Sequence, residues 1–514
     1  MDTNQKLYLF QLIKSLSSSE KGYVKKYCAK NGAGAAYLKL FDAVEKQVVY
    51  DEEAIKKRFK KEKFVNQFSV AKNYLIKAIL KSLRSYHAES SKNIQVHELL
   101  LEIEILHGKR LAGLSQKLLR KAKKIALESE LYNHYAEISF WDFRLTLSAE
   151  YTDQTDQQME TIKKVGNEGM DSILLLYQYR HLAYDIYKYT LKSGYSREAA
   201  ALAVAHDFEQ HELLQAPPTQ SVRALGRYYN IWTKIHEIKN DFEAGYETSR
   251  KFVAVIQDNP LIFADFLMST VVPAHYNLVA ICVSLNKKEM FFECLEYFKK
   301  IPVLYKCKNE LIIQMVDCYA ISLELSFYTQ NAYFDLAKDI LATAEAMVQE
   351  QALPSIGLGV LHLEMVYSIA YAHFGLGNYN TSEDWVAIAL NQQKNNIRED
   401  IICLAQLLHI NNHVALGNYQ YLNNRLRSVY QFIKKMKKAH AFELVMLQFI
   451  KKLINAKSNQ EFFDLIKTYK TQFVEIEKDP FVKMIMKNFD VISMLESKLQ
   501  DRPFAEIAAE RRAK

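Results

Sequence analysis

The sequence predicts an all-α protein, an α-solenoid of about eight or nine long helical hairpins that follows an N-terminal helical module. Two segments forty positions apart, 373–379 and 413–419, share the sequence motif HxxLGNY. Glycine and proline number only 15 and 8 in 514 residues, less than half of what average usage of about 7% and 5% gives. A chain with so few turn residues cannot make the many turns of a large sheet, so we expect essentially no strand.

The first ninety residues are predicted to form a separate basic module. They hold 18 lysines and arginines against 9 acidic residues, a net charge of +9, whereas the remainder of the chain carries −1. Residues 17–20, Ser-Ser-Ser-Glu, match a capping box, and the apolar spacing up to residue 86 fits four or five helices. The stretches 12–27 and 37–47 resemble the start of uncharacterised bacterial helical-repeat proteins, a resemblance that implies no known activity.

A turn residue recurs every 40 to 46 positions through the middle of the chain. Nearly all of these residues are Gly or Asn, which tolerate the left-handed conformation that ends a helix. Apolar residues at helical spacing precede and follow each turn, so the predicted unit is a helical hairpin. The turn positions are Gly108, Glu150, Gly194, Asn240, Asn286, Asn331, Gly377 and Gly417.

The hairpin around Gly377 resembles the tetratricopeptide repeat. That family places a small residue, an aromatic, a Gly-x-Tyr turn and further small residues at set positions. The family period is about 34 residues, so the hairpins here are longer, and the resemblance, covering about residues 92 to 435, is strongest in 363–433. The matching residues are Ala370, His373 in place of the aromatic, Gly377, Tyr379, Ser382 and Ala389.

These patterns predict three modules. Residues 1–90 form the basic module, and residues 91–435 form the repeat array, with a possible break at the two prolines within 215–220. Residues 436–514 are expected to close the array with one helical pair, at 441–454 and 460–472, and a capping helix at 480–499.

The resemblance implies a non-enzymatic scaffold that binds a protein or peptide partner of unknown identity. In the tetratricopeptide family the first helix of each hairpin lines the concave face. Polar side chains on that face would hold the backbone of a partner, and aromatic ones would bury area against it. The exposed positions carried over to this chain are Arg227, Asn230, Lys234, Tyr276, Tyr367, Tyr371 and Asn411.

A basic cluster in the first module allows a second interpretation. Aromatic residues interleave its cations, as in surfaces that contact nucleic acid or other anionic partners. The alternative that we favour is a solvated helix face, because acids at 51–53 can pair with it at helical spacing. If the cluster does bind, the protein would be a regulator with a nucleic-acid- or protein-contacting module and ligand-sensing repeats. The cluster is Lys56, Lys57, Arg58, Lys60, Lys61 and Lys63.

No motif supports catalysis or a cofactor. The chain has no phosphate-binding glycine loop, dinucleotide fingerprint or nucleophile elbow. His409 and His413 are spaced like metal ligands on a helix, but they lack the glutamate of HExxH and a third ligand is not evident. His236, His373 and His413 all lie four residues before a turn, so we interpret them as packing residues, with no metal site.

The sequence is typical of a cytoplasmic protein. Its first residues make a poor signal peptide, and its longest apolar stretch, 261–285, is interrupted by polar residues and fits a buried helical pair better than a membrane span. Six scattered cysteines without a CxxC pair indicate a reducing compartment. We therefore expect no membrane partner.

Overall fold

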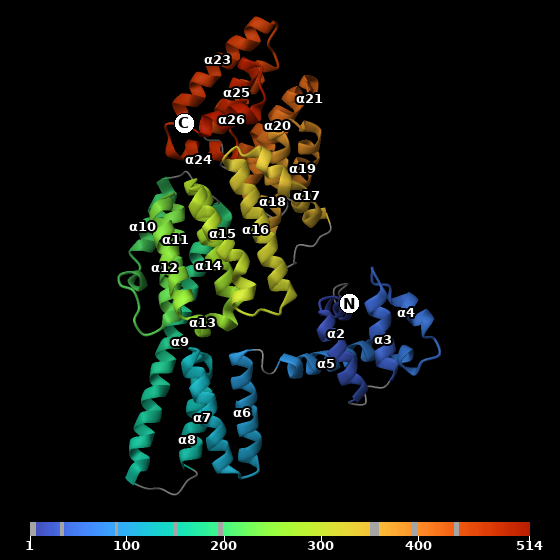
Figure 1. Ribbon diagram of the computed structural model, residues 1–514, viewed down its shortest axis with the longest axis vertical. Coiled ribbons are helices and arrows are strands. Elements are labelled where there is room, and N and C mark those ends of the chain that lie inside the picture. The colour runs from blue at the N-terminus through green and yellow to red at the C-terminus, as the bar shows by residue number, and fades with distance from the viewer. Residues whose placement is uncertain are drawn as a thin grey trace. The chain divides into compact units, whose positions relative to one another are not determined.

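A computed structural model describes residues 7–30, 35–87, 91–147, 153–193, 199–349, 359–391, 398–435 and 441–513. Every regular element in these ranges is a helix and none is a strand, so the predicted all-α class is confirmed (Figure 1). The chain divides into two compact units, Met1–Ile173 and Leu174–Lys514, which are described separately. The three modules drawn from charge and repetition stay predictions.

In the first unit, five α-helices enclose an apolar core of their own, to which Leu9, Phe41 and Ile79 contribute. The predicted capping box is confirmed. The backbone N–H of Ser17 donates to Glu20 Oε2 at 2.8 Å, and the N–H of Glu20 donates to Ser17 Oγ at 3.2 Å. The helices of this unit are α1 (Tyr8–Lys14), α2 (Ser18–Lys30), α3 (Ala35–Lys46), α4 (Glu52–Arg58), α5 (Phe68–His87), α6 (Lys92–Gly108), α7 (Ala112–Glu128) and α8 (Tyr135–Leu147).

In the second unit, short turns join consecutive helices into hairpins, and first helices of neighbouring hairpins pack together, α14 on α16 and α16 on α18 (Figure 1). The long helix α9 (Asp153–Ser193) begins in the first unit and ends in the second, and α10 (Ala199–Glu209) follows it. The hairpins are α11 (Val222–Ile238) with α12 (Phe242–Asp258), α14 (Val272–Leu285) with α15 (Lys288–Leu304), α16 (Glu310–Gln330) with α17 (Phe334–Gln349), α18 (Gly359–Gly375) with α19 (Tyr379–Asn391), α20 (Glu399–Ala415) with α21 (Tyr419–Lys435), and α22 (Ala441–Leu453) with α23 (Asn459–Ile476).

Left-handed residues end several helices at the predicted turn positions. Asn240, Asn286, Gly377 and Gly417 all have φ between 55° and 79°, as expected from the tolerance of Asn and Gly for this conformation. In two other turns the left-handed residue comes just after the expected one, at Arg110 instead of Gly108 and at Ala332 instead of Asn331. The remaining turn residues, Glu150 and Gly194, lie outside the described residues.

The helices that follow the hairpins share their apolar core, which runs without a break from Phe252 to Ala508. The helical pair expected at 441–454 and 460–472 is present as α22 and α23. The single capping helix expected at 480–499 is wrong, because Asp490 caps a new helix with its side chain and divides the stretch in two. The three resulting helices, named the α24–α26 segment below, are α24 (Pro480–Asn488), α25 (Val491–Gln500) and α26 (Phe504–Arg512).

Two helical stretches are long and apolar enough to cross a membrane by composition alone, Pro260–Leu285 and Glu310–Gln330. The protein itself buries 61% and 56% of their most apolar windows. The first stretch is also interrupted, because α13 (Pro260–Phe263) and two short helical turns precede α14. This pattern is typical of core helices.

A neutral histidine is buried in α14. The His275 ring stacks on Tyr297 with 5.3 Å between the ring centroids, and its Nδ1 lies 2.8 Å from the carbonyl oxygen of Val271, to which a protonated Nδ1 donates. Burial lowers the pKa of His275 to about 4, although the hydrogen bond to Val271 partly favours the charged form. Since an unfolded histidine has a pKa of about 6.5, acid favours the unfolded chain at this position.

We predict that this histidine makes the second unit sensitive to acid. Its contribution to stability is complete above about pH 6.5 and is lost as the pH falls toward 4, by about 3 kcal/mol in all. Urea unfolding measures the free energy of unfolding of the wild type and of His275→Gln between pH 7.5 and 4.5. We expect the difference between these two free energies to become smaller as the pH falls. Replacing the exposed His206 with Gln is the control and leaves the pH dependence unchanged; parallel curves for wild type and His275→Gln would contradict the prediction.

Candidate functional site

Four of the side chains expected on the concave face line one cavity in the second unit. This large cavity has a volume of about 440 Å³ and is walled by α9, α11, α14, α16 and α18. Arg227, Asn230 and Lys234 lie on one face of α11 because they are three and four residues apart. Tyr276 of α14 completes the set.

Most charges in the wall of the large cavity are already paired. Lys234 Nζ donates to Glu237 at 2.8 Å and to Asn277 Oδ1 at 3.2 Å. The guanidinium of Arg398 forms ion pairs with Glu364 and, at 3.0 Å, with Asp400. The part of the cavity wall that contains these paired residues therefore carries little net charge.

Arg227 differs from the other cations of the cavity. It is half-buried, and it forms no ion pair or hydrogen bond with another residue in the ranges that the structure describes. Burial lowers its pKa, and repulsion from the nearby Arg180 acts in the same direction. An arginine stays protonated even so, because its ordinary pKa lies above 12. The α11 side of the cavity therefore presents a positive charge that no carboxylate of the described residues neutralises.

A small cavity of about 160 Å³ adjoins the large one and shares Tyr276, Glu364 and Arg398 with it. Its opposite wall comes from α24, where Lys487 Nζ donates to the carbonyl oxygen of Ser284 at 2.5 Å. Burial is the main reason that the pKa of Lys487 is lowered. The α24–α26 segment thus forms one wall of the small cavity.

The expectation that Tyr367, Tyr371 and Asn411 are exposed is wrong. The three side chains are 6%, 2% and 2% exposed, and Tyr367 lines the small cavity. The hydroxyl of Tyr367 donates to the carbonyl oxygen of Asn488 at 2.9 Å. The hydroxyl of Tyr371 accepts the N–H of Asp490 at 3.0 Å. The α24–α26 segment covers these tyrosines, and Asn411 turns back to the carbonyl oxygen of Leu407 in its own helix.

Asp490 is a buried carboxylate, 3% exposed, at the centre of this contact. It caps α25 through the N–H of Ser493 at 3.0 Å and accepts the Ser493 hydroxyl at 2.8 Å. Arg511 Nη1 of α26 donates to it at 2.6 Å. Because burying a carboxylate is costly unless it is paired, these partners are needed together.

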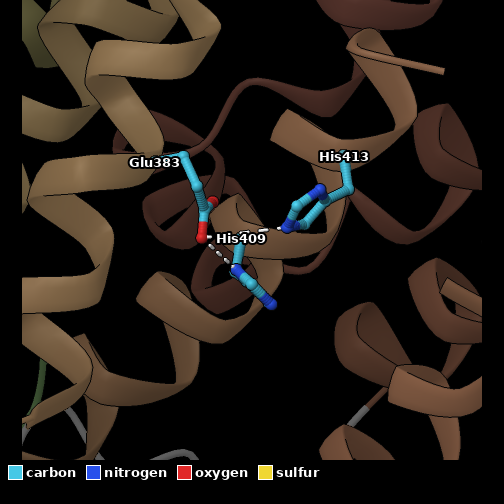
Figure 2. Close-up of side chains that lie close together, drawn as sticks. All are labelled: Glu383, His409 and His413. Atoms are coloured by element: carbon cyan, nitrogen blue, oxygen red, sulfur yellow. Dashed lines mark hydrogen bonds and ion pairs between the residues drawn. The ribbon is translucent and has the colours of Figure 1, made fainter. Parts of the chain in front are cut away.

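A second group of polar side chains lies between α19, α20 and α21. Figure 2 shows the carboxylate of Glu383 directed toward the rings of His409 and His413. Glu383 Oε1 lies 2.6 Å from His409 Nδ1 and 3.9 Å from His413 Nε2. Burial is the main cause that lowers the pKa of His413, and Glu383 opposes that effect.

Glu383 is the partner that the sequence analysis missed. It lies 26 residues before His409, on the second helix of the preceding hairpin, so no local spacing connects the two. The sequence held one indirect indication that Glu383 lies near α20. Its neighbour Ser382 matches a small position of the repeat, and Ser382 accepts a hydrogen bond from Asn412 of α20 at 3.0 Å. Of the other histidines interpreted as packing residues, His373 pairs with Glu345 at 2.7 Å, and His236 lies against Trp232.

The basic cluster of the first unit is mostly exposed and unpaired. The expected pairing within the helix occurs only at Lys56, which lies 2.9 Å from Glu52 and 3.0 Å from Glu53. Arg58 lies over the ring of Phe59. The other cations are Lys57, Lys60, Lys61 and Lys63, and none of them or Arg58 forms an ion pair with a residue in the described ranges.

Comparison with known proteins adds no family to this description. No family model, no curated protein and no solved structure matches the chain. The resemblance to the tetratricopeptide repeat therefore depends on the residues of this chain alone. The features that bear on function are its cavities and side-chain clusters.

We predict that Asp490→Ala destabilises the second unit by about 3 kcal/mol, because it leaves the half-buried Arg511 without one of its two carboxylates and removes the cap of α25. Hydrogen exchange would increase first in the α24–α26 segment. The control is Glu475→Ala, which removes an exposed pair with Lys478 and changes stability by less than about 0.5 kcal/mol. Equal effects of the two substitutions on urea unfolding would show that Asp490 does not hold the segment.

Proposed function

We propose that the protein is a non-enzymatic, cytoplasmic adaptor that binds a peptide or a protein segment on the concave face of a tetratricopeptide-like solenoid. The observation that carries the proposal is the large cavity. Arg227, Asn230, Lys234 and Tyr276, assigned to the concave face through the repeat register, all line it. A cavity of about 440 Å³ is within the range of ligand sites and has room for a few side chains.

The charges of the cavity favour an acidic partner segment. Arg227 offers a planar guanidinium to a carboxylate, a geometry that permits two parallel hydrogen bonds. The carboxamide of Asn230 makes no hydrogen bond with a described residue, so it is available to a peptide backbone as donor and acceptor. Tyr276 supplies an aromatic face next to these polar groups.

The α24–α26 segment limits where such a partner binds. It covers Tyr367 and Tyr371 and leaves the part of the concave face that includes α11 and α14 open. The bound segment in this proposal is therefore short, a few residues at the α11 side of the cavity, and does not run along the whole array.

The exposed cations of the first unit favour a second candidate function. Lys57, Arg58, Lys60, Lys61 and Lys63 form no ion pair with a described residue, and the aromatic Phe59 lies among them. Such a cluster suits a regulator whose first module contacts nucleic acid or an anionic protein surface. Binding of this kind weakens steeply as salt rises, which separates it from binding in the half-buried cavity.

We predict that the protein retains acidic peptides from an array of 12-residue acidic, neutral and basic sequences, and that Arg227→Gln weakens their binding by about tenfold. The reason is that one charge-assisted hydrogen bond is worth about 1.5 to 3 kcal/mol. Fluorescence anisotropy of the best acidic peptide measures the change in Kd.

Arg250→Gln is the matched control for this experiment. Arg250 is an exposed arginine of α12, 63% accessible, that pairs with Glu247 three residues earlier. We expect its replacement to leave the Kd unchanged. Equal loss in both variants would indicate nonspecific attraction, and failure to retain any acidic peptide would refute the proposal.

A further inference from the structure

The side chains around Glu383 bring two histidines and one carboxylate together. His409 and His413 follow each other by one helical turn on α20, and Glu383 approaches them from α19 (Figure 2). One ligand atom from each of the three residues lies within 4.8 Å of the other two. Two imidazole nitrogens and one carboxylate oxygen therefore converge on one point from two helices.

The separations are close to those that a bound metal ion requires. Ligand atoms about 2.0 to 2.2 Å from a tetrahedral zinc ion lie roughly 3.3 to 3.5 Å from one another. Glu383 Oε1 is 2.6 Å from His409 Nδ1 and 3.9 Å from His413 Nε2, so one distance is shorter and the other longer than this value. All three atoms lie within 4.8 Å of one another, so the side chains have to move closer together for each atom to reach bonding distance from one ion.

The outer nitrogen of each histidine already has a hydrogen-bond partner. His409 Nε2 lies 3.0 Å from the hydroxyl of Tyr421, and His413 Nδ1 lies 3.0 Å from the carboxamide of Asn418. The inner nitrogens, His409 Nδ1 and His413 Nε2, both face Glu383. The Tyr421 hydroxyl can accept from His409 Nε2–H, as the outer partner of a metal-binding histidine does. At His413 the amide nitrogen of Asn418 donates to Nδ1, so metal binding through Nε2 requires the Asn418 amide to rotate and present its oxygen to a protonated Nδ1.

The carboxylate is also held in place. Asn412 donates to Glu383 Oε2 at 3.3 Å, which directs Oε1 at the histidines. No lysine or arginine in the described ranges forms an ion pair with Glu383, whose partners there are the two imidazoles and the Asn412 amide. A purely structural carboxylate at this depth would gain more from a cation, and a divalent ion supplies that charge.

We propose that Glu383, His409 and His413 bind one divalent transition-metal ion of the zinc class. Two nitrogens and one oxygen form a donor set that zinc and cobalt accept and that magnesium and calcium, which prefer oxygen ligands, do not. Water takes the fourth position. The ion links α19 to α20 and so joins neighbouring hairpins, a property independent of the peptide binding proposed above.

The test uses the full chain without an affinity tag, freed of metal by a chelator and dialysed. Titration with Co²⁺ is expected to show one equivalent per chain by its visible absorption, and Zn²⁺ is expected to displace it. Elemental analysis after dialysis gives the stoichiometry, and Zn²⁺ raises the midpoint of thermal unfolding by about 3 °C or more when it is well above its Kd.

The variants His413→Ala and Glu383→Gln are expected to weaken Co²⁺ binding by about 100-fold or more, because each removes a ligand. Both positions are partly exposed, so these variants keep the test valid even where His409→Ala fails to fold. His206→Ala is the control, since His206 is an exposed histidine 3.7 Å from Glu209, and it leaves binding unchanged. Less than stoichiometric metal in the wild type, or equal binding by all variants, overturns the proposal.

Discussion

Asp490 joins the helices of the α24–α26 segment through its carboxylate and joins the segment to the hairpins of the second unit through its backbone N–H. Asp490 caps α25 and pairs with Arg511 of α26, while its backbone N–H donates to Tyr371 of α18. Since an unpaired carboxylate at this depth would cost several kcal/mol, its contacts with Ser493 and Arg511 have to form together. The rings of Tyr371 and Phe374 then pack against Phe489 and Phe504, which extends the hairpin core into the segment.

The α24–α26 segment also borders one of the cavities of the second unit. The segment covers α18 at the two tyrosines and forms one wall of the small cavity, so the large cavity beside α11 is the open remainder. Within it, ion pairs neutralise Lys234 and Arg398 and leave the positive charge of Arg227.

The features that the sequence revealed are those with a local physical cause. Asn240, Asn286, Gly377 and Gly417 were found because few residue types tolerate a positive φ. The capping box at Ser17 was found because its two hydrogen bonds lie within four residues. Arg227, Asn230 and Lys234 were brought to one cavity because helical periodicity alone puts them on one face.

The features that the sequence did not reveal depend on distant pairs. Tyr371 and Asp490 are 119 residues apart, and no sequence pattern around either residue predicts the contact between them. The partner of His409 was missed for the same reason, because Glu383 belongs to a different hairpin. The repeat register predicts Tyr371 to be an exposed contact residue. It is buried because the α24–α26 segment, which comes later in the chain, covers it.

The covered tyrosines have a consequence for the order in which the chain is made. Tyr367 bonds to the carbonyl oxygen of Asn488, 121 residues later in the sequence. At a synthesis rate of about 5 to 20 residues per second, α18 is complete for roughly 6 to 24 s before its covering segment exists. During that interval Tyr367 and Tyr371 lack the cover that the α24–α26 segment later provides, so the second unit cannot complete its core until the end of the chain has been made.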